Sequence, residues 1–342
     1  VNLGGIGDFL LSTPALRALK GRFPKAQLAA LVNSSIYELA KDLTYIDEVF
    51  TFSLKYGELI PLARSLENFL VLMSLRRKRF DIAINMRTLV SAKGARKINF
   101  IFNLINPKIK AGRNTNSMGT FFDLKIPETL IGEKYEMEYD IDTVRTLGAE
   151  VKSRDIDFSI DEKSYKKIEH ILTKNKIARG DKIIGLHLGG KPSHRWPIKN
   201  FVKAIKIIND SVSCRFIATG TGDEKQLVLL LKTVCEADIL DLSGQLNLKE
   251  LGALIKRCNL YISNDTGPMH ISAVLNTPLL AIFGPGYLTR FDPRNISTKA
   301  VVIKGNADCS PCENTICNDL RCLSSIDPEV VAGEALKIFR NQ

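Results

Sequence analysis

The 342-residue chain lacks an unbroken run of about 20 apolar residues, which is the length that a membrane-spanning helix needs. It also lacks an N-terminal leader with a basic start, an apolar stretch and a small-residue cleavage site, so we do not expect secretion. Disulfide bonds among its seven cysteines are therefore not expected. These absences predict a cytoplasmic protein. The length suits two domains of ordinary size.

Acidic residues are almost missing from one basic stretch. Between Arg76 and Arg113 there are eleven Lys and Arg residues and a single acid, Asp81, in a chain whose net charge is +11. The plain interpretation is a solvated helix face, but clustering on this scale favours a polyanion or an anionic membrane surface as partner. No aromatic-interleaved basic motif accompanies the charge, so we expect no nucleic acid.

Short apolar runs alternate with longer amphipathic ones along most of the chain. This alternation predicts parallel sheets covered by helices, an α/β fold. The expected strands are Phe80–Met86, Lys182–His187, Cys214–Thr219, Asp238–Leu242, Leu260–Ser263 and Pro278–Phe283, and Val1–Leu3 ends an earlier one. The expected helices are Asp8–Arg22, Gly57–Arg79, Pro197–Asn209, Asp223–Cys235, Leu248–Arg257 and Asp327–Arg340. A polar stretch near residue 165 predicts the domain boundary there.

A glycine cluster that ends in an acid, Gly4-Gly5-Ile6-Gly7-Asp8, follows the first expected strand and opens a helix. The spacing is not the GxGxxG of dinucleotide-binding proteins. Asp8 has two interpretations of equal weight. It is an N-cap that stabilises the helix by about 1 kcal/mol, or it is a general base that projects into a cleft between the domains.

A second glycine pair lies in the segment Gly189–Pro197, between a strand and a helix. Its glycines and two cations suit a diphosphate, with backbone N–H groups around it and Lys191 or Arg195 neutralising its charge. Trp196, the only tryptophan, is interpreted as a packing anchor. His187 and His194 fit ordinary structural positions, and no spacing here indicates a metal.

The most specific local signal is Ser263-Asn264-Asp265-Thr266-Gly267-Pro268-Met269-His270. A helix that begins near Gly267 offers free N–H groups and a positive dipole end to a phosphate. Thr266 and His270 add donors, and Asp265 is expected to bind sugar hydroxyls. The alternative is an Asp/Thr cap on a buried helix.

Three weaker motifs complete the set. Glu224, in the turn after the strand at 214–219, suits ribose hydroxyls, although an acid in the first turn of a helix also complements the dipole. The loop 242–245 could line an adenine. The thiols Cys309, Cys312, Cys317 and Cys322 form either a structural zinc clip or a set of reduced thiols.

Three of these segments resemble the ADP-heptose:lipopolysaccharide heptosyltransferases, glycosyltransferase family 9. They are VNLGGIGDFLLSTPALRALK at 1–20, the segment 242–285 with NDTGPMH, and the terminal CSPC…C…C…DPEVV pattern, and HLGGKPSHRWP at 187–197 also fits. The resemblance implies a GT-B fold of two Rossmann-like domains with parallel sheets facing an inter-domain cleft. It implies an acceptor domain at 1–165, a donor domain at 166–325, and a final helix at 326–342 that packs back on the first domain.

The resemblance also implies roles for individual residues. Asp8 stands at the catalytic base position, with Gly5, Gly7 and Thr13 on the acceptor side. Lys191 and Arg195 face the diphosphate, where the family often has Lys at the position of Arg195, and Glu224 matches the acid that binds the ribose. Asp265 matches the contact to the donor sugar, and Thr266, Gly267, Pro268 and His270 match the phosphate-binding turn.

The function that follows is an inverting, metal-independent transfer of heptose from ADP-heptose to the lipopolysaccharide inner core. It would take place at the inner face of the cytoplasmic membrane and would require no cofactor beyond the possible structural zinc. Two alternatives remain. One is a GT-B transferase or epimerase that uses another nucleotide sugar, such as a UDP-hexosamine, and the other is a binding module that senses nucleotide sugars.

Overall fold

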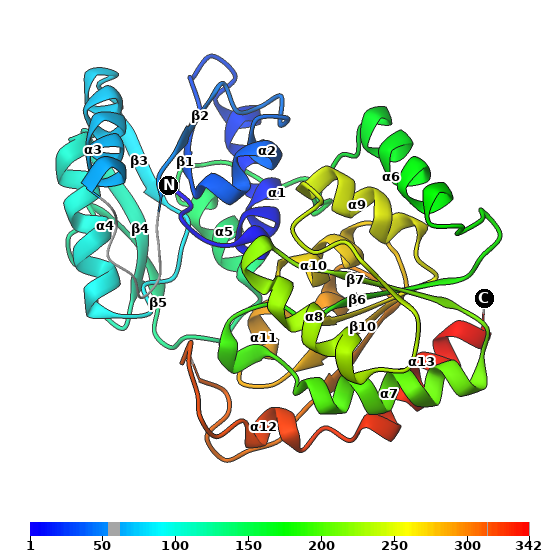
Figure 1. Ribbon diagram of the computed structural model, residues 1–342. Helices are drawn as coiled ribbons and strands as arrows, with labels where there is room; N and C mark the ends of the chain where they lie inside the picture. Colours follow the sequence, from blue (N-terminus) through cyan, green and yellow to red (C-terminus); the bar gives the residue numbers. More distant parts are fainter. Residues whose placement is uncertain (54–61, 313, 342) are drawn as a thin grey trace. The chain divides into compact units, whose positions relative to one another are not determined.

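The computed structural model describes residues 1–53, 62–312 and 314–341 of the chain (Figure 1). They fall into two compact units, Val1–Asp157 and Phe158–Gln342. The first unit therefore ends at residue 157, whereas the sequence predicts the boundary near residue 165.

The first unit is built on short parallel strands. β1 (Ala29–Val32) pairs with β2 (Glu48–Thr51), and β4 (Ile109–Thr115) lies between β3 (Ile82–Asn85) and β5 (Leu124–Glu128). The chain start joins these two sets, because the Asn2 amide donates to Leu31 at 2.9 Å and the Met86 amide donates to Val1 at 3.0 Å. The order across the unit is β2, β1, residues 1–3, β3, β4, β5.

Five helices accompany these strands in the described part of the first unit. They are α1 (Ile6–Arg22), α2 (Tyr37–Ala40), α3 (Leu62–Arg77), α4 (Ala92–Ile105) and α5 (Glu136–Arg145). The ends of α4 follow from local chemistry. The Ser91 hydroxyl accepts a hydrogen bond from the Gly94 amide, and Asn106 ends the helix with φ 54°, a left-handed conformation that Asn tolerates. Buried Phe102 and Ile105 turn the inner face of α4 toward the core.

The second unit contains a six-stranded parallel sheet in the order β11-β10-β9-β6-β7-β8. Its strands are β6 (Ile183–His187), β7 (Arg215–Thr219), β8 (Ile239–Asp241), β9 (Leu260–Asn264), β10 (Leu279–Phe283) and β11 (Ala300–Lys304). Strands β6, β9 and β10 are buried along their whole length. This burial explains their near-continuous apolar sequences, because both faces of a parallel sheet are covered by helices.

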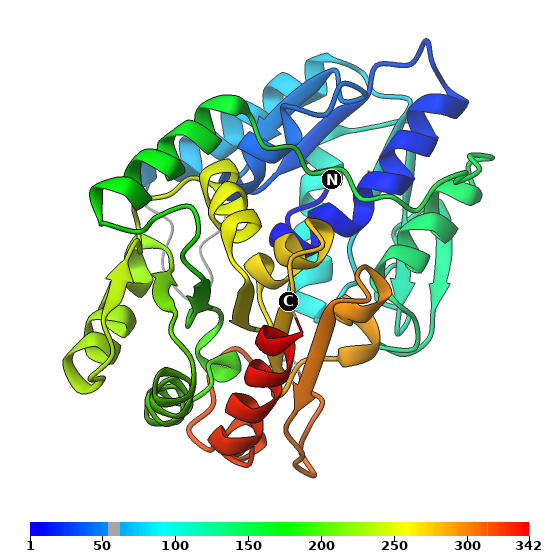
Figure 2. The same ribbon diagram turned by 90° about the vertical axis from the view of Figure 1, so that its right-hand side faces the viewer.

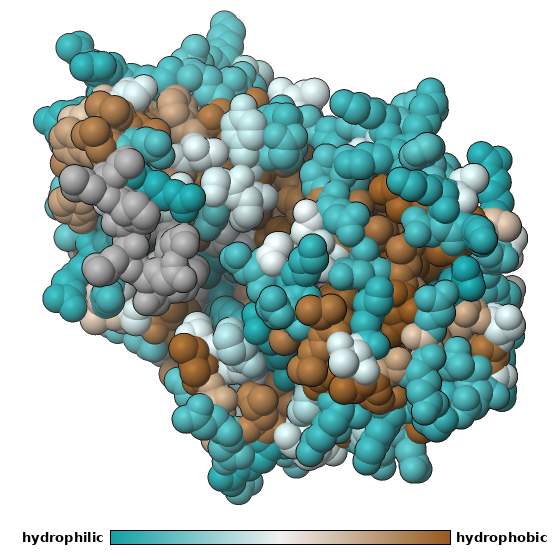
Figure 3. All heavy atoms as spheres, in the orientation of Figure 1, coloured by the Kyte–Doolittle hydropathy of each residue, from teal (hydrophilic) through white to brown (hydrophobic). Residues whose placement is uncertain are grey.

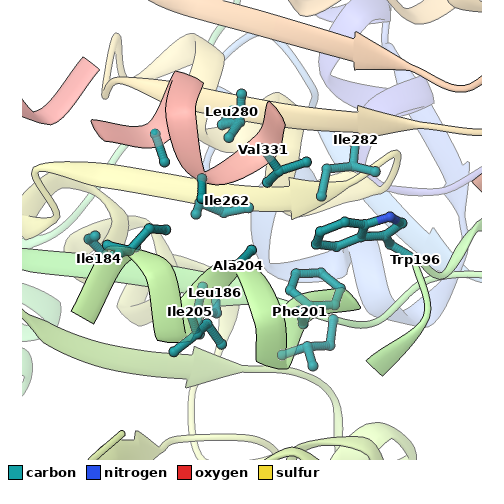
Figure 4. Packing of buried hydrophobic residues seen from close by; sticks show 14 of the residues in the cluster. Ile184, Leu186, Trp196, Phe201, Ala204, Ile205, Ile262, Leu280, Ile282 and Val331 are labelled. Atoms are coloured by element: carbon teal, nitrogen blue, oxygen red, sulfur yellow. The ribbon is translucent and has the colours of Figure 1, made fainter. Parts of the chain in front are cut away.

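The helices of this unit are α6 (Glu162–Lys174), α7 (Ile198–Ser211), α8 (Lys225–Val234), α9 (Leu248–Arg257), α10 (Gly267–Val274), α11 (Leu288–Phe291), α12 (Arg321–Ser324) and α13 (Pro328–Arg340). Side chains from β6, β9, β10 and α7 interlock in the core around Trp196 (Figure 4). Trp196 is 1% exposed and stands edge-on to Phe201, with ring centroids 4.8 Å apart. The packing role predicted for Trp196 is thereby confirmed.

The last helix, α13, belongs to the core of the second unit. It packs against α7 and strands β9 and β10 (Figure 2). Val331, Ala332, Ala335 and Phe339, which form its apolar face, lie within the same cluster as the sheet residues. The sequence prediction placed this helix on the first domain. In the structure its apolar face is already used within the second unit.

The strands and helices expected after residue 3 are present within a few residues in the described part of the chain, whereas Val1–Leu3 forms only an isolated bridge, from Asn2 to Val32. The expected helix 57–79 corresponds to α3, and its residues 57–61 lie outside the described residues. Among the described residues, no helix is both long enough and apolar enough to span a bilayer.

Candidate functional site

Both units share one strand order, and this order defines where ligands bind. Counting residues 1–3 as the first strand of the first unit, the order in each sheet is 3-2-1-4-5-6, that of the doubly wound nucleotide-binding fold. In such sheets ligands bind beyond the carboxyl ends of the strands at the switch point between strands 1 and 4. The switch points lie between residues 1–3 and β3 in the first unit, and between β6 and β9 in the second.

Asp8 lies at the switch point of the first sheet. Helix α1 begins at Ile6 with Gly5 as its N-cap, so Asp8 is the third helical residue and not the N-cap. Its Oδ2 accepts a hydrogen bond from the Gly5 amide at 2.8 Å and pairs with Arg87 Nη1 at 2.5 Å. Its Oδ1 has no hydrogen-bond partner among the described residues. One carboxylate oxygen thus stabilises the helix start, and the other is a buried acceptor whose hydrogen-bonding capacity the described residues do not use.

The three residues predicted on the acceptor side lie in different environments. Gly5 is exposed in the turn, whereas Gly7 is buried within α1. Thr13 is fully buried one turn further along, where its hydroxyl donates to the Leu10 carbonyl and accepts from the Asp157 amide. Thr13 therefore fixes the end of the first unit and does not lie in a loop.

The loop after β6 is held against the loop after β9. The Asn264 side chain does most of this, because its Nδ2 donates to Leu188 and Gly189 carbonyls and its Oδ1 accepts from the Trp196 amide at 3.1 Å. A Cβ at Gly190 would stand 2.7 Å from Thr266 Cγ2, so the two loops touch at the switch point.

The two predicted cations of this loop differ in their contacts. Arg195 Nε donates to the Gly190 carbonyl at 2.8 Å, and its Nη2 lies 4.0 Å from Glu224 Oε1. Lys191 is exposed. Arg195 therefore shapes the turn as well as adding charge to it, and Lys191 is free to move toward an anion.

Glu224 connects two neighbouring loops at the edge of this site. Its carboxylate accepts from the Gly190 amide at 2.7 Å and from the Thr221 amide at 2.8 Å. Burial raises the pKa of Glu224, but the nearby His187 and these amides outweigh burial and bring the pKa below its ordinary value. The carboxylate is therefore ionised at neutral pH. A Cβ at Gly189 would stand 2.2 Å from the carboxylate, so any other residue there would push the carboxylate aside.

Asp265 faces a histidine that stays neutral. His194 Nε2 lies 4.0 Å from Asp265 Oδ2, and both side chains are about nine-tenths buried. Burial, together with the charge of Lys191, lowers the pKa of His194 to about 4. An uncharged His194 forms no ion pair with Asp265, and a carboxylate is a hydrogen-bond acceptor suited to sugar hydroxyl groups.

The predicted anion turn opens α10. Thr266 is the N-cap of this helix, and Pro268 lies in its first turn. The Thr266 hydroxyl is buried and has no hydrogen-bond partner among the described residues. His270 is buried one turn further in, where its ring lies edge-on to Phe291 with centroids 5.9 Å apart. Thr266 and Gly267 thus lie at the N-terminal end of α10, and His270 lies one turn inside the helix.

The four-cysteine segment supports the loops of this site. The Ser193 hydroxyl donates to the Asn314 carbonyl at 2.6 Å, and the Cys312 amide donates to the Pro285 carbonyl at 2.8 Å. Burial and then the neighbouring Cys309 raise the pKa of Cys322. Among the described residues, no three His, Cys, Asp or Glu side chains come together as metal ligands. The structural zinc clip stays a prediction, and the segment contacts the loops of the site through these two hydrogen bonds.

Sequence reasoning gave no role to three residues that shape the site. The motif of Asn264 indicates no function for that residue, the position of His194 looks ordinary, and Arg87 stands out only as part of the basic stretch. A polar side chain at the carboxyl end of an expected strand was the available signal for Asn264 and Arg87. The stretch itself is not one surface, since Arg113 is fully buried.

The chain is similar to known proteins over most of its length. Residues 70–321 match the family model for glycosyltransferase family 9 (heptosyltransferase). The chain is 25% identical to lipooligosaccharide heptosyltransferase 2 of Campylobacter jejuni over 98% of this chain and 96% of that protein. It is 26% identical to lipopolysaccharide heptosyltransferase 2 of Escherichia coli over 87% of this chain and 85% of the other.

Solved structures show the same architecture. A family 9 glycosyltransferase from Veillonella parvula superposes with a TM-score of 0.76 at 20% identity, covering 99% of this chain and 96% of the other. E. coli ADP-heptose lps heptosyltransferase II gives 0.69 at 19% identity, with 99% and 98% covered. E. coli heptosyltransferase WaaC with ADP-2-deoxy-2-fluoro heptose gives 0.64 at 17% identity, with 99% and 98% covered.

These likenesses confirm the predicted GT-B fold. The family model spans most of the chain, from within α3 to the start of α12. It therefore includes the β6 loop, the Glu224 turn and the α10 turn, where the donor-side residues were expected. The chain belongs to glycosyltransferase family 9, the heptosyltransferase family, and is a glycosyltransferase.

Proposed function

We propose that this enzyme transfers heptose from ADP-heptose to the inner core of lipopolysaccharide by an inverting, metal-independent single displacement. The names of the relatives support the donor and the acceptor, since they include lipopolysaccharide heptosyltransferase 2 and ADP-heptose lps heptosyltransferase II. The observation that carries the proposal is the pairing of chemistries at equivalent places. A carboxylate lies at the switch point of one sheet, and a helix N-terminus lies at that of the other.

The donor binds at the second unit. The N-terminus of α10 offers backbone N–H groups and the positive end of the dipole to the diphosphate. The cations Lys191 and Arg195 add to this, as does the Thr266 hydroxyl, which has no hydrogen-bond partner in the described part of the chain. Glu224 binds a ribose hydroxyl in exchange for one of its backbone amides, and Asp265 accepts hydrogen bonds from the sugar.

The reaction follows from these positions. Asp8 removes the proton from an acceptor hydroxyl while that oxygen attacks the anomeric carbon. The bond between the anomeric carbon and the diphosphate breaks, and ADP leaves with its electron pair. The α10 dipole and Arg195 stabilise the negative charge that develops on ADP. Attack opposite to the leaving group inverts the anomeric configuration.

The acceptor is carried by the inner face of the cytoplasmic membrane, and the first unit has a surface suited to it. Leu66, Phe69 and Leu70 form a stripe on α3 at helical spacing and are 58%, 48% and 58% exposed. Phe100 on α4, the helix that packs beside α3, is 61% exposed. Brown side chains gather over these helices in Figure 3.

Exposed cations flank these apolar side chains at Arg76, Arg77, Lys93 and Arg96. Apolar anchors next to cations favour an anionic bilayer.

A donor screen tests the proposal. Purified enzyme is incubated with ADP-heptose, UDP-N-acetylglucosamine or UDP-glucose and a lipid A–Kdo acceptor, with and without EDTA. We expect turnover with ADP-heptose, no loss on chelation, and inverted stereochemistry by NMR of the product. Turnover of a UDP-sugar alone, or release of an epimerised UDP-hexosamine, would instead support the other reaction class.

A further inference from the structure

The two loops at the switch point of the first sheet bring opposite charges together. Asp8 follows the strand at residues 1–3, and Arg87 follows β3. Arg87 Nη1 lies 2.5 Å from Asp8 Oδ2, and the two side chains are 21% and 15% exposed. This ion pair therefore occupies the place where doubly wound sheets bind ligands.

The glycine turn leaves room for this pair. A Cβ at Gly4 would stand 1.9 Å from Arg87 Nη1 and 2.7 Å from Asp8 Oδ2. Any side chain at position 4 would therefore displace the guanidinium. The first glycine of the motif has a definite use, which is to let Arg87 reach Asp8.

A buried cluster fixes the backbone on both sides of Arg87. Arg113, which is fully buried, donates to the Met86 carbonyl at 3.1 Å and to Thr88 Oγ1 at 2.9 Å. The Thr88 hydroxyl in turn donates to Glu128 Oε1 at 2.8 Å. Before the loop, Asn85 Nδ2 donates to the Arg87 carbonyl at 2.6 Å. The loop therefore has little freedom to carry Arg87 away from Asp8.

Arg113 is itself held by carboxylates of α5. Its Nη1 pairs with Glu136 at 2.6 Å and its Nη2 pairs with Asp140, and neither acid is exposed beyond 1%. Burying three charges gains little net stability, because desolvation offsets the attraction. Stability alone therefore does not account for the cluster, whereas precise placement of the 86–88 loop does.

We propose that Arg87 is a positioning residue that acts through Asp8. This inference rests on the proposed role of Asp8 as general base. Arg87 and the Gly5 amide hold Oδ2, which fixes the carboxylate in one orientation and leaves Oδ1 to take the proton. A misplacement of about 1 Å at a reacting group can cost on the order of 100-fold in rate. The Arg113 cluster sets the loop and so acts one step further from the chemistry.

The test compares Arg87→Met and Arg87→Lys with the wild type. Arg87→Met keeps the side-chain stem and removes the charge. We expect kcat to fall roughly 10- to 100-fold, with KM for donor and acceptor within about 3-fold. Arg87→Lys should recover part of kcat, since an ammonium group can also pair with Asp8 Oδ2. Arg145→Met on α5, where the side chain is 63% exposed, is the matched control and should leave kcat unchanged.

A double variant separates this inference from the proposed function. If Arg87 acts only through Asp8, Asp8→Asn with Arg87→Met should be no slower than Asp8→Asn alone. Full turnover by Asp8→Asn would overturn the role of Asp8. An inactive Asp8→Asn beside an unimpaired Arg87→Met would overturn only the role of Arg87, as would a further loss in the double variant.

A gentler change guards against a folding defect. Thr88→Val keeps the shape and removes the hydroxyl that joins Arg113 to Glu128. We expect a kcat loss smaller than that of Arg87→Met, with ADP affinity by calorimetry unchanged. If Thr88→Val lowers the thermal midpoint but leaves kcat intact, the Arg113 cluster only stabilises the fold, and its proposed role in positioning Arg87 is wrong.

Discussion

Single side chains carry the chemistry, and some of them could be assigned from sequence. Asp8, Glu224 and Asp265 each follow an expected strand, so the carboxyl-end rule located them. The structure places Glu224 against the Gly190 loop and Asp265 beside His194. Arg87 could not be assigned to Asp8, because nothing local in the sequence states which side chain of one loop meets which of another.

Replacing Asp8 by Asn separates catalysis from donor binding. The amide keeps the shape but cannot accept the proton, so kcat should fall about 10²- to 10⁴-fold. ADP affinity should stay within about 2-fold, because the nucleotide is proposed to bind at the second unit. Steady-state kinetics and calorimetry measure the two effects. Loss of ADP binding in this variant would contradict the assignment.

His194 should make stability depend on pH. Its pKa falls from 6.5 to about 4 in the folded protein. The unfolded chain therefore binds the proton first, and stability is lost as the pH falls from about 6.5 toward 4. The shift corresponds to about 3 kcal/mol at most.

The measurement is urea unfolding of wild type and His194→Asn at several pH values. The difference between the two free energies of unfolding should be constant above pH 7 and should change toward pH 4, with the wild type losing more. A pH-independent difference would show that His194 titrates normally.

Asn264 should be one of the costlier side chains to replace. Asn264→Leu leaves two carbonyls and the Trp196 amide without their partner in a buried place. We expect a loss of about 3 kcal/mol in unfolding free energy. Asn295→Leu, at an exposed position of the same unit, is the control and should change it by less than about 0.5 kcal/mol. Equal effects would show that the three hydrogen bonds of the Asn264 side chain do not stabilise the second unit.

At the scale of elements, periodicity predicted what is strongly buried. The second sheet was found from its apolar runs because β6, β9 and β10 are buried on both faces. Strands β1, β2, β4 and β5 of the first unit and β11 of the second went unrecognised. Strands β1 and β2 are four residues long and mostly half-buried, so their sequences show little contrast between inner and outer faces.

The α3 stripe should govern membrane binding. Replacing Leu66, Phe69 and Leu70 together by Gln removes the apolar anchors and keeps the helix. Cosedimentation with phosphatidylglycerol vesicles should weaken at least 10-fold, and phosphatidylcholine vesicles should bind poorly throughout.

The control uses a similar feature elsewhere. Leu229 and Leu230 on α8 are 54% and 50% exposed, and their replacement by Gln should leave vesicle binding unchanged. Equal losses in both variants would show that exposed leucines bind vesicles without regard to place.

At the scale of the whole molecule, the alternation of apolar and amphipathic runs predicts two α/β halves. It does not predict that both units have the same strand order. The order itself depends on which strands pair across long stretches of chain, and residues 1–3 take part with only a few hydrogen bonds. The family resemblance supplied the GT-B fold, which periodicity alone could not specify.

Nucleotide should stabilise the units unequally. A ligand that binds only the folded second unit at 100 times its Kd adds about 2.7 kcal/mol to the stability of that unit. Calorimetric scans with ADP should therefore shift the transition assigned to residues 158–342, identified by Asn264→Leu. A shift confined to the other transition would place the nucleotide on the first unit.

Gly4 and Gly189 occupy matching places, each just beyond the first strand of its sheet, and each clears space for a charged group of a neighbouring loop. One added methyl group at either glycine would evict Arg87 or Glu224. Alanine at position 4 should therefore give an enzyme that binds ADP normally but turns over about as slowly as Arg87→Met, and alanine at position 189 should weaken donor binding while leaving Asp8 intact. A single methyl group thus weakens catalysis at one glycine and donor binding at the other.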